Sequence, residues 1–201
     1  MTTFDKVLNQ LIDQVNKLPL MAKAAFFAAA SEALFPLYED FAKKKEWGDP
    51  RLLREAIDGV ALYVAGAQDR PDLNMLLAVE RLVPHGDDFD APMSTYAQDA
   101  VICVDVALRL ILGDKNASVS ALEFALEPVR TVIAIEQLGC LDPGSSLEAQ
   151  SWWDRLPDEP RMAKAIKFLE SLVIQLTEEV ITPSFVRTVG VQGRSFLATG
   201  S

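Results

Sequence analysis

Residues 24–30 read AAFFAAA, and this run decides the fold because it is rich in alanine and apolar on every side. Alanine is the strongest helix former, and a helix without a polar face belongs in a protein interior. We therefore expect a central helix over about residues 20–35. Pro36 follows, and because proline removes a helical hydrogen bond, we expect the helix to bend or break there before a short helix continues to about Lys45.

The segments outside this run show helical periodicity. Apolar residues recur at three-and-four spacing over residues 4–18, and Pro19 ends that pattern. Asp49 suits the N-cap position and Pro50 the first helical position of the next helix. Further helices are expected over about residues 50–65, 71–83, 93–112, 118–138, 147–156 and 158–181, with a kink at Pro128. No strand pattern recurs, so we predict an all-α single domain of about seven to nine helices.

The C-terminal segment has a different composition. Residues 183–201 contain no acidic residue, three glycines and the two arginines Arg187 and Arg194. Pro183 ends the last predicted helix, and little helical pattern follows it. We therefore divide the chain into a helical domain at 1–182 and an irregular tail at 183–201. Six apolar residues in the tail favour a strap lying across the domain over a disordered end.

Charge excludes several classes of partner. The chain of 201 residues has 19 basic and 29 acidic residues, a formal net charge of -10. This balance disfavours nucleic acids and anionic membranes, which attract clustered lysine and arginine. It favours a basic protein partner. The N-terminus lacks the pattern of a secretory signal, and Cys103 and Cys140 are expected to be reduced, so we predict a cytoplasmic protein.

Four segments carry a resemblance to a known family. Residues 32–41 read EALFPLYEDF and are similar to the pattern E-R-x-x-P-x-Y-x-x-F. The pairs GD at 48–49, LR at 53–54 and ID at 57–58 resemble its next helix, and PHGDDFD at 84–90 with YAQDA at 96–100 resembles its following loop and helix. Over about residues 20–182 the chain thus resembles the YjaG-like family of helical bacterial proteins of unknown function.

The resemblance has two departures within these segments. Ala33 stands where the pattern has arginine, and Ala61 stands where a large residue is expected. The last 19 residues have no counterpart in the pattern. The resemblance implies a compact helical fold in a divergent member, and it implies no catalytic residues.

Asp87, Asp88 and Asp90 form the densest carboxylate group of the chain. Hard cations such as Ca²⁺ or Mg²⁺ prefer oxygen ligands, but the spacing does not fit an EF-hand loop. Aspartates also cap helices and make turns, and this interpretation is preferred, so no metal site is predicted. His85 is the only histidine and lies outside any visible catalytic arrangement.

Asp99 lies on an otherwise apolar face of its predicted helix. At ~100° per residue, it points away from the polar stripe that contains Gln98, Asp105 and Arg109. A buried carboxylate is costly unless it is paired or hydrogen-bonded. We predict a structural buried acid tied to the loop at residues 87–90 or to a neighbouring helix. A ligand-facing acid with a raised pKa is the alternative.

Trp152 and Trp153 are adjacent, so both cannot point inward from one helical face. An exposed tryptophan favours a binding surface. We therefore select Trp152 and Trp153, together with Asp87, Asp88 and Asp90, as candidate partner-binding residues.

The sequence favours a protein that acts by binding rather than by catalysis. It lacks a phosphate-binding glycine loop, a nucleophile elbow and a cysteine beside a base, so no cofactor and no enzymatic activity are expected. The leading hypothesis is an acidic immunity protein that neutralises a basic, nuclease-type bacterial toxin. The alternatives are a housekeeping helical protein, or a small-ligand or divalent-metal enzyme using Asp99 and the loop at residues 87–90.

Overall fold

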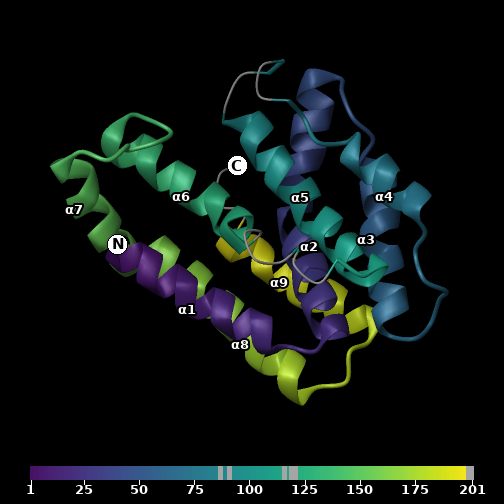
Figure 1. The fold of residues 1–201 in the computed structure, drawn as a ribbon. Helices are drawn as coiled ribbons and strands as arrows, with labels where there is room; N and C mark the ends of the chain where they lie inside the picture. The colour runs from purple at the N-terminus through teal and green to yellow at the C-terminus, as the bar shows by residue number, and fades with distance from the viewer. Residues whose placement is uncertain (86–87, 90–91, 115–116, 118–121, 198–201) are drawn as a thin grey trace.

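The computed structural model describes residues 1–85, 88–89, 92–114, 117 and 122–197. Over these residues the chain forms nine α-helices and one short 3-10 helix, and the part of the chain so described contains no strand (Figure 1). The predicted all-α fold with seven to nine helices is confirmed. The elements are α1 Thr3–Lys17, α2 Leu20–Lys45, α3 Pro50–Val64, α4 Leu73–Glu80, α5 Met93–Leu112, α6 Leu122–Leu138, α7 Leu147–Arg155, η1 Leu156–Asp158, α8 Pro160–Glu178 and α9 Pro183–Leu197.

Helix α2 is the centre of the fold, as its alanine-rich run predicted. Every residue from 24 to 35 is buried, and α2 packs most extensively against α5 and then against α9 and α3. In length and composition α2 could also cross a membrane, but most of its apolar window is buried within the protein. It is therefore the core helix around which the others are arranged (Figure 1).

The predicted break at Pro36 is wrong. Helix α2 continues through Pro36 to Lys45 without interruption. A proline in a helix interior costs about 3 kcal/mol, because it removes one hydrogen bond and crowds the preceding turn. Leu34, Leu37 and Tyr38 are buried around Pro36, and the burial of such side chains on both sides of the proline outweighs that cost.

The predicted irregular tail is also corrected. Residues 183–197 form helix α9, which packs against α2 and α8. Its glycines serve close packing rather than flexibility. A Cβ at Gly193 would lie 2.6 Å from the Phe168 ring and 3.0 Å from Ala33 Cβ. The segment does lie across the domain, as the strap interpretation expected, but as a helix within the common core.

One helix start differs from expectation and another agrees with it. The N-cap of α8 is Glu159, not Asp158, and its side chain accepts hydrogen bonds from the backbone amides of Arg161 and Met162. Asp49 caps α3 as predicted, accepting from Arg51 N at 2.9 Å. Cys103 is buried, Cys140 is half-buried, and these two described thiols are free.

Candidate functional site

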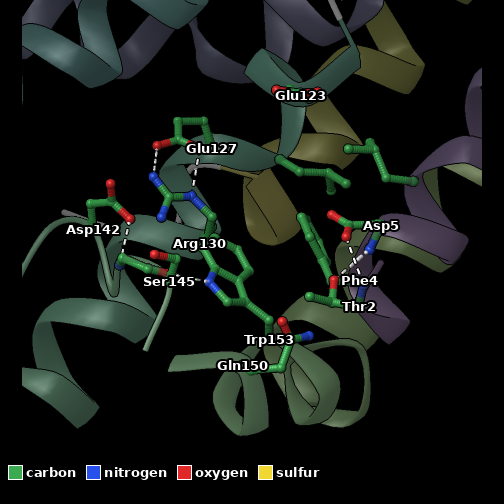
Figure 2. A pocket seen from close by; sticks show the side chains of 13 residues that line it. Thr2, Phe4, Asp5, Glu123, Glu127, Arg130, Asp142, Ser145, Gln150 and Trp153 are labelled. Atoms are coloured by element: carbon green, nitrogen blue, oxygen red, sulfur yellow. Dashed lines mark hydrogen bonds and ion pairs between the residues drawn. The ribbon is translucent and has the colours of Figure 1, made fainter. Parts of the chain in front are cut away.

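A cleft of about 450 Å³ opens between the N-terminal half of α1, one face of α6, and α7 with the connection that precedes it (Figure 2). Its walls combine carboxylates, aromatic rings and one guanidinium. The lining residues are Thr2, Phe4, Asp5, Leu8, Glu123, Leu126, Glu127, Arg130, Asp142, Gly144, Ser145, Gln150 and Trp153. The cleft is therefore built from segments that lie more than a hundred residues apart in the chain.

Local capping fixes the α1 wall. The Thr2 hydroxyl accepts a hydrogen bond from Asp5 N at 3.0 Å, and Asp5 Oδ2 accepts one from Thr2 N at 2.7 Å. This reciprocal pair is a capping box, which satisfies two amides at the helix start. Asp5 is thus held at the rim of the cleft by the backbone that it caps.

A second contact joins α1 to α7. Thr3 donates to Asp154 Oδ1 from its backbone amide at 2.6 Å and from its hydroxyl at 3.0 Å. The hydrogen bond from the Thr3 amide, followed by that from its hydroxyl, lowers the pKa of Asp154. The two walls of the cleft are therefore tied together at one end.

The aromatic part of the cleft consists of Phe4 and Trp153, whose ring centroids lie 5.7 Å apart. Trp153 is half-buried and donates from Nε1 to Gly144 O at 3.3 Å. Trp152 is only 4% exposed, packs edge-on against Trp153, and donates to Gln137 Oε1 at 2.9 Å. The two tryptophans thus face different surroundings, as their adjacency predicted, and Trp153 is the one that lines the cleft.

The face of α6 supplies charge at helical spacing. Glu123, Glu127 and Arg130 lie three or four residues apart, so they project to one side of the helix. With Asp5 and Asp142 added, the cleft holds four carboxylates and one guanidinium, a formal net charge of -3. Such a surplus of negative charge attracts cations and repels anions.

Arg130 makes the densest set of contacts in the cleft. Its Nε donates to Glu127 Oε2 at 2.6 Å, and its Nη2 donates to the other oxygen of the same carboxylate. Its Nη1 donates to Leu141 O at 3.3 Å, and its guanidinium carbon lies 5.4 Å from the centre of the Trp153 ring. Burial acts to lower the pKa of Arg130, but the hydrogen bonds and charge of Glu127 outweigh it and raise that pKa.

Asp99 lies on α5 next to this part of α6 and is not among the residues that line the cleft. It is 1% exposed, and its Oδ2 has no hydrogen-bond partner. Burial raises the pKa of Asp99 well above its ordinary value, the charge of Glu127 raises it further, and Arg130 opposes the shift. Asp99 is therefore a buried acid, as its helical position predicted, and its surroundings favour the protonated form.

Among the described residues, the charges that shift the pKa of Asp99 lie on α6. Glu127 and Arg130 shift the pKa of Asp99, and burial together with the charge of Asp99 raises the pKa of Tyr96 to about 12. Glu127 and Arg130 belong to a neighbouring helix, which is one of the two ties that the sequence allowed, whereas Asp87 and Asp90 lie outside the described residues. The structural role of Asp99 stays a prediction.

Asp88, the described aspartate of the acidic loop, is not among the residues that line the cleft. Asp87 and Asp90 lie outside the described residues, and Asp88 is exposed in the connection between α4 and α5. Phe89 beside it packs against Phe41 and Trp47, with centroids 5.1 and 5.3 Å apart. The ring contacts of Phe89 are thus with Phe41 and Trp47 and not with Trp152 or Trp153. Among the described residues, no group of three or more His, Cys, Asp or Glu side chains could hold a metal ion.

Sequence reasoning missed a second charged cluster in the core. Glu32 is 1% exposed and accepts hydrogen bonds from Arg54 Nη1 and, at 2.6 Å, from Arg194 Nη2. The Arg54 guanidinium also lies 4.0 Å from the centre of the Phe35 ring. A glutamate inside an apolar run was the available signal for a buried ion pair. Arg194 is 162 residues away and could not be assigned to it from the sequence.

The fold and the cleft together define a compact, all-helical protein with an acidic, aromatic-lined cleft on one side. A family model described as "Protein of unknown function (DUF416)" matches residues 10–189, and the chain belongs to this family. The crystal structure of a DUF416 family protein from Shewanella baltica OS155 is similar to this chain, with a TM-score of 0.71 and 20% sequence identity. The similarity covers 92% of this chain and 93% of that one, and it shows the fold alone. No match was found among curated proteins. The finer YjaG-like resemblance stays a prediction.

Proposed function

We propose that this protein acts by binding, and that its acidic cleft receives a basic segment of a protein partner. The lining of the cleft carries the proposal. Four carboxylates and one guanidinium line the cleft, and the Phe4 and Trp153 rings form an aromatic surface within it. Lysine and arginine side chains are attracted both by carboxylates and by aromatic faces.

The electrostatics of the whole chain support the same partner. The net charge of -10 accelerates encounter with a basic protein and slows encounter with an acidic one. The proposed partner is a basic, nuclease-type toxin, and the protein would be its immunity protein in the cytoplasm. A negative surface placed over the cationic groove of a nuclease blocks access of its substrate without any chemistry on the inhibitor's side.

Of the predicted partner-binding residues, Trp153 is the one that enters this proposal. It lines the cleft, whereas Trp152 lies behind it, bound to Gln137. Asp88 is exposed elsewhere and is not needed for the cleft to bind. Nothing in the described residues favours a metal-dependent enzyme over a binding protein as the function of this cleft.

The proposal is tested by nuclease inhibition. The purified protein is titrated into a basic, toxin-type nuclease domain, and residual cleavage of nucleic acid is measured. We expect stoichiometric inhibition that is lost in the triple variant Asp5→Asn, Glu123→Gln, Asp142→Asn. The amides at positions 5 and 142 retain acceptors for the backbone amides of Thr2 and Gly144, and the three substitutions remove three charges.

A matched triple variant controls for net charge. Glu55→Gln, Asp69→Asn and Asp72→Asn remove three exposed carboxylates around the groove between α3 and α4. Inhibition by this variant should stay close to that of the wild type. Equal loss in both triple variants, or no inhibition by the wild type, would count against the proposal. So would turnover of any substrate that disappears on Asp99→Asn or Asp88→Asn.

A further inference from the structure

The contacts of Arg130 show which cation the cleft recognises. A two-point hydrogen bond to a carboxylate, a backbone carbonyl and an aromatic face are the three partners by which proteins bind a guanidinium. Arg130 has all three in Glu127, Leu141 O and the Trp153 ring. Figure 2 shows its guanidinium between Glu127 and Trp153, on the wall of the open cleft. A lysine ammonium cannot reproduce the planar two-point pair.

The binding carboxylate is held in place without Arg130. Thr131 donates from its hydroxyl to Glu127 Oε1 at 3.2 Å, and Thr131 is itself buried. Glu127 therefore keeps one hydrogen bond when Arg130 leaves. Because Glu127 and Arg130 are three residues apart on α6, the exchange requires a new rotamer of Arg130 and no movement of the helix.

The cleft also retains charge for a second cation. With Arg130 counted, Asp5, Glu123 and Asp142 remain in excess, and the charge of Asp142 already acts on Arg130. The connection at residues 139–146 that supplies Leu141 O is exposed for most of its length, so it can follow an incoming side chain. An entering guanidinium would therefore meet the groups that now bind Arg130, together with further cleft carboxylates that Arg130 does not neutralise.

We propose that Arg130 is an internal occupant of an arginine-binding site, and that the partner inserts an arginine side chain which displaces Arg130 from Glu127 and Trp153. This inference rests on the proposed function and specifies the side chain that the cleft receives. Arg130 lowers the affinity of the cleft for any guanidinium that competes with it. The site therefore selects partners whose arginine binds Glu127 and Trp153 strongly enough to displace Arg130.

Two labelled peptides of glycine and serine, one with three arginines and one with three lysines, test the inference by fluorescence anisotropy. Arg130→Met keeps the length of the side chain but vacates the guanidinium position. We expect it to bind the arginine peptide at least about tenfold more tightly than the wild type. The lysine peptide should gain much less, and adding Glu127→Gln to Arg130→Met should abolish the gain.

A remote arginine provides the control for net charge. Arg109 on α5 pairs with Asp105 at 2.6 Å and with Glu80, so Arg109→Met removes the same charge away from the cleft. It should change peptide affinity less than about twofold. Circular dichroism verifies that each variant folds. If Arg130→Met does not fold, Arg130→Lys serves instead, because it keeps the charge but cannot make the two-point pair.

The outcomes separate the two proposals. If the wild type binds the arginine peptide through the three cleft carboxylates but Arg130→Met binds it no more tightly, the inference about Arg130 fails and the binding function stands. An equal gain for the lysine peptide, or for Arg109→Met, also overturns the inference. If neither the wild type nor Arg130→Met binds either peptide, both proposals fail.

Discussion

The cleft and the contact between α2 and α9 both contain carboxylates and guanidiniums, but in opposite proportions. At the α2–α9 contact, one carboxylate, Glu32, is shared by two guanidiniums and is almost fully buried. In the open cleft, four carboxylates line the walls and only one of them, Glu127, pairs with the single guanidinium of Arg130. At the α2–α9 contact the carboxylate is fully paired, and this pairing holds the two helices together. In the cleft the carboxylates outnumber the guanidinium and lie beside aromatic rings, so they are available to a partner. The comparison predicts that changes at the first region alter stability and changes at the second alter binding.

The largest effect on stability is expected at Glu32. Glu32→Gln leaves Arg54 and Arg194 without their shared carboxylate, and because both guanidiniums stay partly exposed the loss should be up to about 3 kcal/mol. The matched control is Asp40→Asn, which breaks the exposed pair with Lys44 and should cost about 0.5 kcal/mol or less. Urea unfolding followed by circular dichroism measures both. A loss at Glu32 no larger than at Asp40 would show that the buried cluster does not hold α9.

The close approach of α9 to α2 gives the next largest effect. A Cβ at Gly190 would lie 2.9 Å from Ala29 O and would also meet the Glu32 side chain, so Gly190→Ala forces the helices apart. Overpacking of this kind costs about 1–3 kcal/mol. Gly59→Ala on α3 is the control, because nothing lies within 4 Å of its Cβ position and alanine is the better helix former. Thermal unfolding should therefore move in opposite directions for the two variants, and a stable Gly190→Ala would argue against tight packing here.

The raised pKa of Asp99 predicts that the stability of the protein depends on pH. Its pKa is raised in the folded protein, so its contribution is fully present below the ordinary value of 3.8 and is lost as pH rises toward the folded pKa. Asp99→Asn removes this titration. The free energy of unfolding of the variant, relative to the wild type, should increase between pH 5 and pH 9 in urea titrations.

The contribution of Asp154 to stability should change with pH in the opposite direction, so Asp154 serves as an internal control. Its pKa is lowered, so its contribution is present above the ordinary value and is lost as pH falls through the folded pKa. Asp154→Asn should therefore flatten the acid limb of the stability profile, by a small amount because Asp154 is exposed. A difference between wild type and Asp99→Asn that does not change with pH would mean that Asp99 is not a buried acid with a raised pKa.

The smallest effect on stability is expected in the cleft. Glu123 is exposed on α6, and Glu123→Gln should change the free energy of unfolding by no more than about 0.5 kcal/mol. Its effect should appear in the affinity for a basic partner instead. A large loss of stability with no change in binding would reverse the contrast between the two regions.

The parts of the fold that local chemistry determines could be predicted from the sequence. The alanine-rich run placed α2 at the centre, Asp49 and Pro50 marked the start of α3, and the helical position of Asp99 indicated its burial. The incorrect predictions at Pro36 and in the C-terminal segment have one cause. Pro36, Gly190 and Gly193 are read locally as helix breakers, but here packing against distant segments outweighs local propensity.

The candidate site was less predictable because it is made by tertiary contacts. Trp153 was selected for its adjacency to Trp152, and it does line the cleft. Asp5 and Glu127, however, come from helices more than a hundred residues apart, and neither belongs to a recognisable motif. The dense acidic group at residues 87–90 drew attention by sequence proximity alone, and its described member Asp88 is not among the residues that line the cleft.

The most direct test of the binding function is the salt dependence of affinity for a basic nuclease domain, measured by calorimetry between low and physiological ionic strength. The wild type should lose affinity steeply as salt rises, because exposed charges are screened. The triple variant of Asp5, Glu123 and Asp142 should bind weakly with a shallow salt dependence, while the triple variant of Glu55, Asp69 and Asp72 should follow the wild type. Identical salt dependences for the wild type and the cleft variant would contradict the claim that the cleft binds the partner.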